Sequence, residues 1–251
     1  MQKQYYQYPL PLNLPATDKS SVEKSEVVSN GNNSISPEDR AFHDWYRFVL
    51  SYPPHLVRDY INNFELDEGS IILDPFCGTG TTIVEAKLNR INAIGLEANP
   101  FPHFASMVKT DWNIAPDELE IFATQVSENT YAELDNQGID DRALTYESNI
   151  ELKTLDKQAM RALIKNSISP LPLHKTLVLL EQINRFQNTP VHKYGVLALG
   201  STLVLSIGNL RFGPEVGVGK IKKDVPVVAI WMHEIRKMIT SRSLPCKVIP
   251  N

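Results

Sequence analysis

The clearest pattern of apolar and polar positions lies in the first half of the chain. A short apolar run at residues 71–73 is followed by a turn with two glycines, a helical pattern at residues 81–89 and a second apolar run at residues 93–96. The two apolar runs are followed by the acids Asp74 and Glu97. Short apolar runs bounded by turn residues are typical of buried strands. This stretch therefore predicts a strand, a Gly-rich turn, a helix and a second strand parallel to the first.

The rest of the chain carries helical spacing. A helix is expected to begin near Ser36, with an apolar stripe formed by Phe42, Trp45, Tyr46 and Val49. Further helices are predicted at residues 55–64 and 101–110, and at residues 116–136, where Pro116 and acids in the first turn mark a helix start. Apolar spacing predicts helices at residues 155–168, 171–186 and 190–207, and a final helix is predicted at residues 225–240. The last of these places Val227, Trp231, Ile235 and Met238 on one side. Polar composition predicts loops at residues 137–150 and 209–224. The pattern indicates an α/β chain with two convincing strands and a large helical part.

Three regions follow from this pattern. Residues 1–35 are rich in Gln, Asn, Ser and Pro without apolar periodicity, and we expect a disordered tail there. Residues 36–112 contain the two strands and form a nucleoside-binding half. Residues 113–251 form a helical region whose C-terminal part is basic.

The Gly-rich turn indicates a nucleoside ligand without phosphates. Glycines let a backbone approach a ligand closely, and an acid at the end of the second strand can accept hydrogen bonds from ribose hydroxyls. Glu97 follows Gly80 at a distance of 17 residues. A dinucleotide fingerprint needs a third glycine where this chain has Ile83, and a phosphate-binding loop needs a lysine after Gly80. With both absent, S-adenosylmethionine is the favoured ligand.

The same residues resemble a known family. The sequence DPFCGTGTT at residues 74–82 looks like the cofactor motif of the DNA amino-methyltransferases, which methylate adenine N6 or cytosine N4. Residues 51–64, SYPPHLVRDYINNF, are similar to the segment that in many members precedes this motif and packs against the methionine end of the cofactor. The resemblance implies a partial Rossmann-like methyltransferase fold. It implies cofactor contacts from Pro53, Asp74, Pro75, Phe76, Cys77, Gly78, Gly80, Thr81, Thr82, Glu97 and Asn99.

One element of the family pattern is missing. Members bind the target amine with a tetrapeptide of the form [DNS]-P-P-[YFW], whose carbonyls accept the amine hydrogens and whose aromatic ring stacks on the flipped base. The one Pro-Pro pair here gives Tyr52-Pro53-Pro54-His55, which lacks both the amide or carboxyl acceptor and the final aromatic ring. The catalytic residues are therefore unknown. We expect a shortened or interrupted reading frame whose product is inactive or weakly active alone.

Four functions are compatible with these observations. The first is a site-specific DNA methyltransferase of the restriction-modification type. The second is a non-catalytic remnant or partner subunit that binds cofactor or DNA. The third is an RNA or protein methyltransferase built on the same nucleotide unit, and the fourth is an unrelated oxidoreductase. Binding of S-adenosylmethionine favours the first three, whereas binding of NAD favours the last.

Composition and charge add partners and exclusions. The net charge is −4, yet residues 209–251 hold eight basic residues against three acidic ones. Two interpretations of this basic end stay open: a solvated helix end, or contact with double-stranded DNA through Arg211, Lys220, Lys222 and Lys223. Two cysteines do not suggest a metal cluster, and the N-terminus lacks a secretory pattern, which indicates a cytoplasmic protein. The uncharged run at residues 194–208 has 15 residues and three glycines, so a buried helix is favoured over a membrane span.

Overall fold

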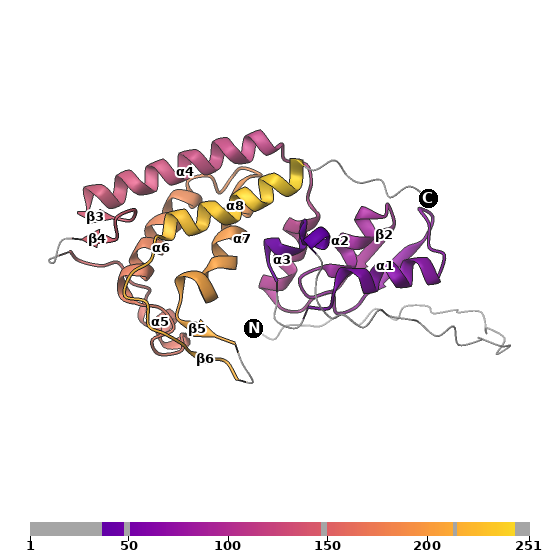
Figure 1. The fold of residues 1–251 in the computed structure, drawn as a ribbon, viewed down its shortest axis with the longest axis horizontal. Helices are drawn as coiled ribbons and strands as arrows, with labels where there is room; N and C mark the ends of the chain where they lie inside the picture. Colours follow the sequence, from indigo (N-terminus) through magenta and orange to yellow (C-terminus); the bar gives the residue numbers. More distant parts are fainter. Residues whose placement is uncertain (1–36, 48–50, 147–149, 213–214, 244–251) are drawn as a thin grey trace, which may run out of the picture. The chain divides into compact units, whose positions relative to one another are not determined.

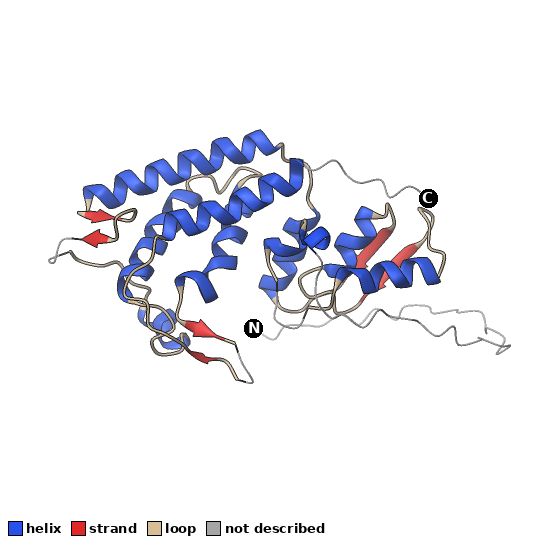
Figure 2. Ribbon diagram, in the orientation of Figure 1, coloured by secondary structure: helices blue, strands red, loops and turns tan. Residues whose placement is uncertain are grey.

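A computed structural model describes residues 37–47, 51–146, 150–212 and 215–243. The predicted strand-turn-helix-strand unit is present (Figure 1). Strands β1 (Ile71–Asp74) and β2 (Asn92–Gly95) run parallel, with Ile71 opposite Asn92 and Asp74 opposite Gly95. Helix α2 (Thr81–Leu88) makes the crossover between them. The chain therefore has the predicted α/β fold, a partial Rossmann-like unit with a large helical extension, and Figure 2 shows how strongly helix predominates.

The two strands pair only with each other among the described residues. Helix α1 (Pro54–Asn63) packs against α2 and buries Val57 and Ile61 in a small core with Ala86 and Ile91. The other face of the sheet is bare. Its side chains are 54–67% exposed and belong to Ile71, Leu73, Ile94 and Leu96. Residue period two thus places one apolar face of the sheet against α1 and α2 and leaves the other in solvent.

The N-terminal segment differs from its predicted helix. Two short 3-10 turns, η1 (Pro37–Arg40) and η2 (His43–Trp45), replace it because Phe42 between them has φ of 62°. Tertiary contacts hold this irregular path: His43 Nε2 lies 2.8 Å from Glu85 Oε1, and Arg58 bridges Glu85 and Asp39 at 3.1 and 2.7 Å. The predicted burial of Phe42 and Trp45 is confirmed, whereas Val49 lies outside the described residues.

The tail predicted at residues 1–35 also lies outside the described residues. The division between residues 36–112 and 113–251 stays a prediction. One apolar core contains residues from both ranges, including Val84 and Ala105 from the first and Leu197 and Trp231 from the second.

The helical extension consists of α4 (Pro116–Asn136), α6 (Pro170–Asn184), α7 (His192–Thr202) and α8 (Val227–Ser243), with α3 (Pro100–Thr110) leading into it. The predicted bounds of α4 are those observed. The predicted inner side of α8 is confirmed, since Val227, Trp231, Ile235 and Met238 are all fully buried. Of the run at residues 194–208, which was expected to form a buried helix, residues 194–202 lie in α7, where Tyr194, Leu197 and Ala198 are fully buried. The run continues as a π-helical turn in which Leu205 is 56% exposed, so its second part differs from the prediction. Among the described residues, no helix combines the length and apolar character needed to cross a bilayer.

Three predicted segments need correction. The two predicted loops each contain a two-stranded antiparallel hairpin, β3 (Ile139–Asp140) with β4 (Thr145–Tyr146), and β5 (Leu210–Arg211) with β6 (Gly217–Val218). Strands of two residues leave no periodic signal in a sequence. The helix predicted at residues 155–168 is only α5 (Lys157–Ala162), because the backbone turns extended at Leu163 after a start capped by Asp156.

Helix α7 ends in a π-helical turn, η3 (Leu203–Ile207), which the sequence did not predict. The carbonyl oxygens at its end are satisfied by a distant side chain. Lys222 Nζ donates to the carbonyls of Leu205, Ser206 and Gly208 at 2.6, 3.0 and 2.7 Å. A cation at a helix C-terminus also complements the helix dipole.

A buried ion cluster joins α6, α8 and the β3–β4 hairpin. Lys175 on α6 is fully buried, and its Nζ lies 3.1 Å from Asp141 Oδ1 and 2.6 Å from Asp224 Oδ1. Asp141 also caps α8 by accepting the backbone N–H groups of Val227 and Val228 at 3.0 and 2.9 Å. Burial raises the pKa of Asp141, although these hydrogen bonds and the charge of Lys175 act in the opposite direction. The cluster fixes where α8 begins.

Candidate cofactor site

Backbone hydrogen bonds connect the turn after β1 to the residues that follow β2. Leu96 N–H donates to the carbonyl of Asp74 at 2.9 Å, and Cys77 N–H donates to the carbonyl of Leu96 at 3.0 Å. The Asp74 side chain accepts the N–H of Phe76 at 3.0 Å. These bonds extend the sheet into the turn and hold the carboxyl ends of both strands at one edge. This is the edge where parallel sheets of this kind bind nucleosides.

The two glycines of the turn have different neighbours. Both have positive φ, 53° at Gly78 and 86° at Gly80. A Cβ on Gly80 would lie 3.1 Å from the Cα of Ser106 and closer still to its side chain, so Gly80 allows α3 to approach the turn. A Cβ on Gly78 would meet no atom within 4 Å. Gly80 thus serves internal packing, while the Cα of Gly78 borders open space.

Substituting these glycines should separate the two roles. Gly78→Ala should cost only the strain of a left-handed alanine, about 1–2 kcal/mol. Gly80→Ala should cost that strain and a further 1–3 kcal/mol or so, because the new methyl group overpacks against Ser106. Urea unfolding of both variants and the unchanged chain measures the difference. Equal losses of stability would contradict the assigned packing role of Gly80.

Glu97 is fixed beside the turn. Its Oε2 accepts the N–H of Gly78 at 3.0 Å and its Oε1 accepts the N–H of Asn99 at 2.7 Å. Each carboxylate oxygen has two lone pairs, so each retains one position for a further donor. The side chain is only partly buried, which leaves these positions within reach of a ligand. The geometry therefore provides two oriented acceptors, one for each of two neighbouring hydroxyl groups.

The remaining residues expected at the site divide into an exposed and a buried group. Pro75, Phe76 and Asn99 are exposed, and Phe76 is 86% exposed. Asn99 caps α3 by accepting the N–H of Phe101 at 3.3 Å. Pro53, Cys77, Gly80 and Thr81 are buried, while Asp74, Gly78, Thr82 and Glu97 are intermediate. The exposed and intermediate residues are accessible at the surface, whereas the buried ones pack inside the protein.

Cys77 is one of the buried residues and packs against the neighbouring strand. Its Sγ would lie 2.8 Å from a Cβ placed on Gly95, so the cysteine and the glycine of the neighbouring strand fit each other. Burial raises the pKa of the Cys77 thiol, which keeps it protonated and a poor nucleophile. The small size of Cys77 therefore accounts for its place in the motif.

Tyr52 is a site residue that the sequence reasoning did not include. Its hydroxyl lies 2.5 Å from Thr82 Oγ1 and donates to Asp74 Oδ2 at 3.1 Å. Burial raises the pKa of Tyr52, so the hydroxyl stays a donor. Its position directly before the Pro-Pro pair was the available signal. Tyr52 thereby links the segment before α1 to both ends of the Gly-rich motif.

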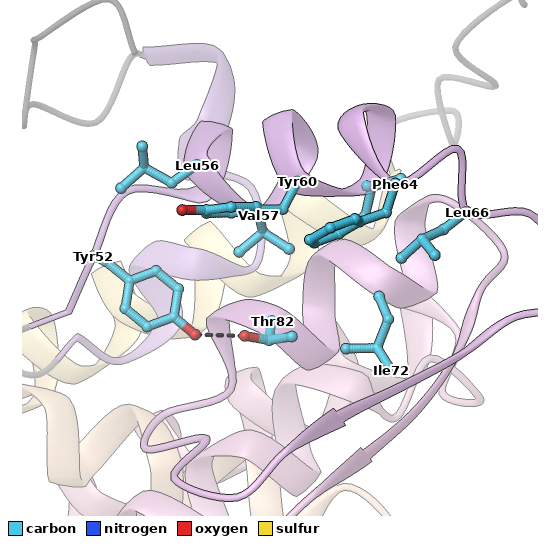
Figure 3. Close-up of a pocket in the computed structure, with 9 residues that line it drawn as sticks. Tyr52, Leu56, Val57, Tyr60, Phe64, Leu66, Ile72 and Thr82 are labelled. Carbon is cyan, nitrogen blue, oxygen red and sulfur yellow. Dashed lines mark hydrogen bonds between the residues drawn. The ribbon is translucent and has the colours of Figure 1, made fainter. Parts of the chain in front are cut away.

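A groove of about 380 Å³ begins at Tyr52 and runs between α1 and β1. Figure 3 shows Tyr52 at one end with its hydroxyl directed at Thr82, and Leu56 and Tyr60 of α1 along the groove with Phe64, which follows α1. The rings of Tyr60 and Phe64 stack with centroids 6.0 Å apart. The groove is apolar along its length and polar at the end that meets Asp74.

Of the four residues expected to contact DNA, three are exposed and one is bound to backbone carbonyls. Arg211, Lys220 and Lys223 are exposed on and after the β5–β6 hairpin. Lys222 has its ammonium group on the carbonyls at the end of η3 and is therefore already engaged. The described residues contain no group of three or more His, Cys, Asp or Glu side chains arranged to hold a metal ion.

Comparisons with known proteins match the segment that carries this site. Residues 4–105 match the model of a family described as DNA methylase. Residues 55–169 match a second model, described as an RMKL-like methyltransferase domain. Both matched ranges contain the Gly-rich turn, Glu97 and residues 55–63 of α1. No solved structure matches the chain significantly.

Two curated relatives align with part of the chain. Type II methyltransferase M.BsoBI of Geobacillus stearothermophilus is 40% identical over 85 residues, which is 34% of this chain and 17% of the relative. Type II methyltransferase M.MjaII of Methanocaldococcus jannaschii is 36% identical over 67 residues, which is 27% of this chain and 12% of the relative. The chain thus aligns with less than a fifth of either relative's length.

Proposed function

We propose that this chain, whose residues 4–105 belong to the DNA amino-methyltransferase family, binds S-adenosylmethionine over its Gly-rich turn. We further propose that it serves methylation of an exocyclic amine of adenine or cytosine in DNA, as part of a restriction-modification system. The family match supports methyl transfer as the reaction class. The reaction, the ligand, its contacts and the nucleic-acid target are all part of the proposal.

The observation that carries the proposal is the placement of Glu97. Its two oxygens are oriented by the N–H groups of Gly78 and Asn99, with one acceptor position left on each. A ribose presents two neighbouring hydroxyl donors to such a carboxylate. The open space beside Gly78 admits the nucleoside, and the exposed ring of Phe76 offers an apolar surface for the adenine.

The other end of the cofactor is assigned to Asp74 and Tyr52. A carboxylate at the end of β1 can hold the ammonium group of the methionine part, because opposite charges attract strongly in a partly buried site. Tyr52 and the N–H of Phe76 hold this carboxylate in one orientation. Bound S-adenosylmethionine supplies an electrophilic methyl group. The chain's own residues orient the two ends of the cofactor and exclude water from one side.

The group that binds the methyl acceptor is not identified. The sequence contains no [DNS]-P-P-[YFW] tetrapeptide, and Tyr52 of the nearest match has its hydroxyl on Asp74 and Thr82. We therefore expect the purified chain to bind cofactor without transferring its methyl group to DNA at a measurable rate.

Calorimetric titration tests the proposal. S-adenosylmethionine and S-adenosylhomocysteine should both bind with one-to-one stoichiometry, and NAD should not bind. Transfer of a labelled methyl group to DNA and to RNA should be assayed with the same preparation. Binding of NAD without S-adenosylmethionine would refute the proposal, and methyl transfer to RNA alone would refute the assignment to DNA.

A further inference from the structure

Among the described residues, some surface lysines and arginines have a partner within the chain and others do not. Most lysines and arginines form ion pairs, hydrogen bonds or ring contacts within the chain. Exposed cations without such a partner lie mainly in two segments, α5 with the residues after it and the β5–β6 hairpin with the residues after it. They are Lys157, Arg161, Lys165, Arg211, Lys220 and Lys223. Two more, Arg185 and Arg236, lie apart from these segments.

The charge of these two segments is strongly one-sided. Residues 157–165 contain no acid, and residues 209–223 contain only Glu215. Seven basic residues against one acidic residue give a net charge of +6, in a chain whose total is −4. So many unpaired cations at one place are not explained by the packing of the protein itself. They call for an anionic partner.

The two segments are held together by Asn209. Its backbone N–H donates to Ser167 at 2.6 Å, and its side-chain amide donates to the carbonyl of Asn166 at 3.0 Å. Its own oxygens accept the N–H groups of Gly219 and Lys222 at 2.6 and 2.9 Å. Asn209 therefore ties the end of the α5 segment to the hairpin, and Figure 1 shows α5 beside β5 and β6.

Lys222 fixes the hairpin from the other side through the carbonyls of η3. The free cations are thus presented by an anchored scaffold. Lys157 and Arg161 are four residues apart on α5, which places them on one side of that helix. Exposed apolar side chains lie among the cations, from 39% exposed at Leu163 to 53% at Val216. Alternating cations and apolar groups suit the alternating phosphates and deoxyriboses of a DNA backbone.

We infer that α5 and the β5–β6 hairpin form one binding surface for the backbone of double-stranded DNA, with Lys157, Arg161, Lys165, Arg211, Lys220 and Lys223 facing the phosphates. This inference rests on the proposed function, because it names the surface through which the DNA of that function is held. Compared with the DNA contacts predicted from the sequence, this surface also includes Lys157, Arg161 and Lys165. It excludes Lys222, whose ammonium group binds the carbonyls of η3.

Matched pairs of substitutions test this surface. Arg161→Gln with Lys220→Gln removes one cation from each segment. Arg185→Gln with Arg236→Gln removes the same charge from unpaired cations elsewhere. Binding of the full chain to a short fluorescein-labelled duplex is followed by anisotropy over a range of KCl concentrations. Because each neutralised phosphate contributes about 0.9 to the salt slope, the first pair should lower the slope by roughly 1.8 and the affinity near 0.15 M salt by roughly thirtyfold.

The control pair should leave slope and affinity within about twofold of the unchanged chain. Equal effects of the two pairs, or no effect of the first, would overturn the surface. Tighter binding to single-stranded RNA than to the duplex through the same residues would overturn its assignment to duplex DNA. Titration with S-adenosylmethionine is run on every variant. Intact DNA binding without cofactor binding would refute the proposed cofactor and leave this surface standing.

Discussion

Glu97→Ala should reduce the affinity for S-adenosylmethionine by roughly 10²- to 10⁴-fold, because two hydrogen bonds to a charged acceptor, each contributing about 1.5–3 kcal/mol, are lost together. The substitution also frees the N–H groups of Gly78 and Asn99, which loosens the turn that the nucleoside contacts. Calorimetric titration of the purified variant measures the loss, and circular dichroism verifies that the fold persists.

Two companion variants sharpen this result. Glu97→Gln keeps one acceptor oxygen and should bind with intermediate affinity. Glu120→Ala removes an exposed acid of α4 and should leave binding unchanged. An affinity in Glu97→Ala equal to that of the unchanged chain would show that the ribose is held elsewhere, and the proposed pocket would have to be abandoned.

The second large effect concerns stability. Lys175→Met leaves Asp141 and Asp224 close together in the interior without their cation, and removing one partner of a buried ion pair costs about 3–5 kcal/mol. The cost should include weaker capping of α8, since Asp141 becomes easier to protonate. The free energy of unfolding in urea measures this change.

Lys153→Met provides the matched control. Lys153 pairs with Glu181, but the two side chains are 38% and 54% exposed, so loss of this pair should cost no more than about 1 kcal/mol. Its backbone N–H still donates to His174 in the variant. Similar losses in the two variants would mean that water reaches Lys175 and that the cluster does not anchor α8.

The sequence predicts best where a period is long or a motif is local. Helix α4 was predicted because Pro116 and the acids after it mark a helix start. The inner side of α8 was predicted because apolar positions recur over several turns, and burial of Trp231 and Met238 follows from that recurrence. The parallel pair β1 and β2 was predicted because both strands are short apolar runs joined by a helix. These features depend on neighbours in the sequence.

Features decided by distant contacts were missed. Phe42 adopts a positive φ because the rings of Phe42 and Trp45 are buried in the core while His43 contacts Glu85. Glu85 lies 42 residues from His43 in the sequence, so a local pattern does not show this contact. The contacts of Tyr52 with Asp74 and Thr82 span 22 and 30 residues. Lys222 resembled a DNA contact because its charge is visible in the sequence, whereas the carbonyls that engage it are not.

The bare face of β1 and β2 has a practical meaning for solution work. Four large aliphatic side chains, each more than half exposed, lie on this face. Among the described residues, β1 and β2 each pair on one side only, so the outer edge of each strand is unpaired. Exposed apolar patches and unpaired strand edges both promote association with other chains. Protein concentration consequently becomes an experimental variable, and each binding constant for this molecule should be measured at several dilutions together with its sedimentation behaviour.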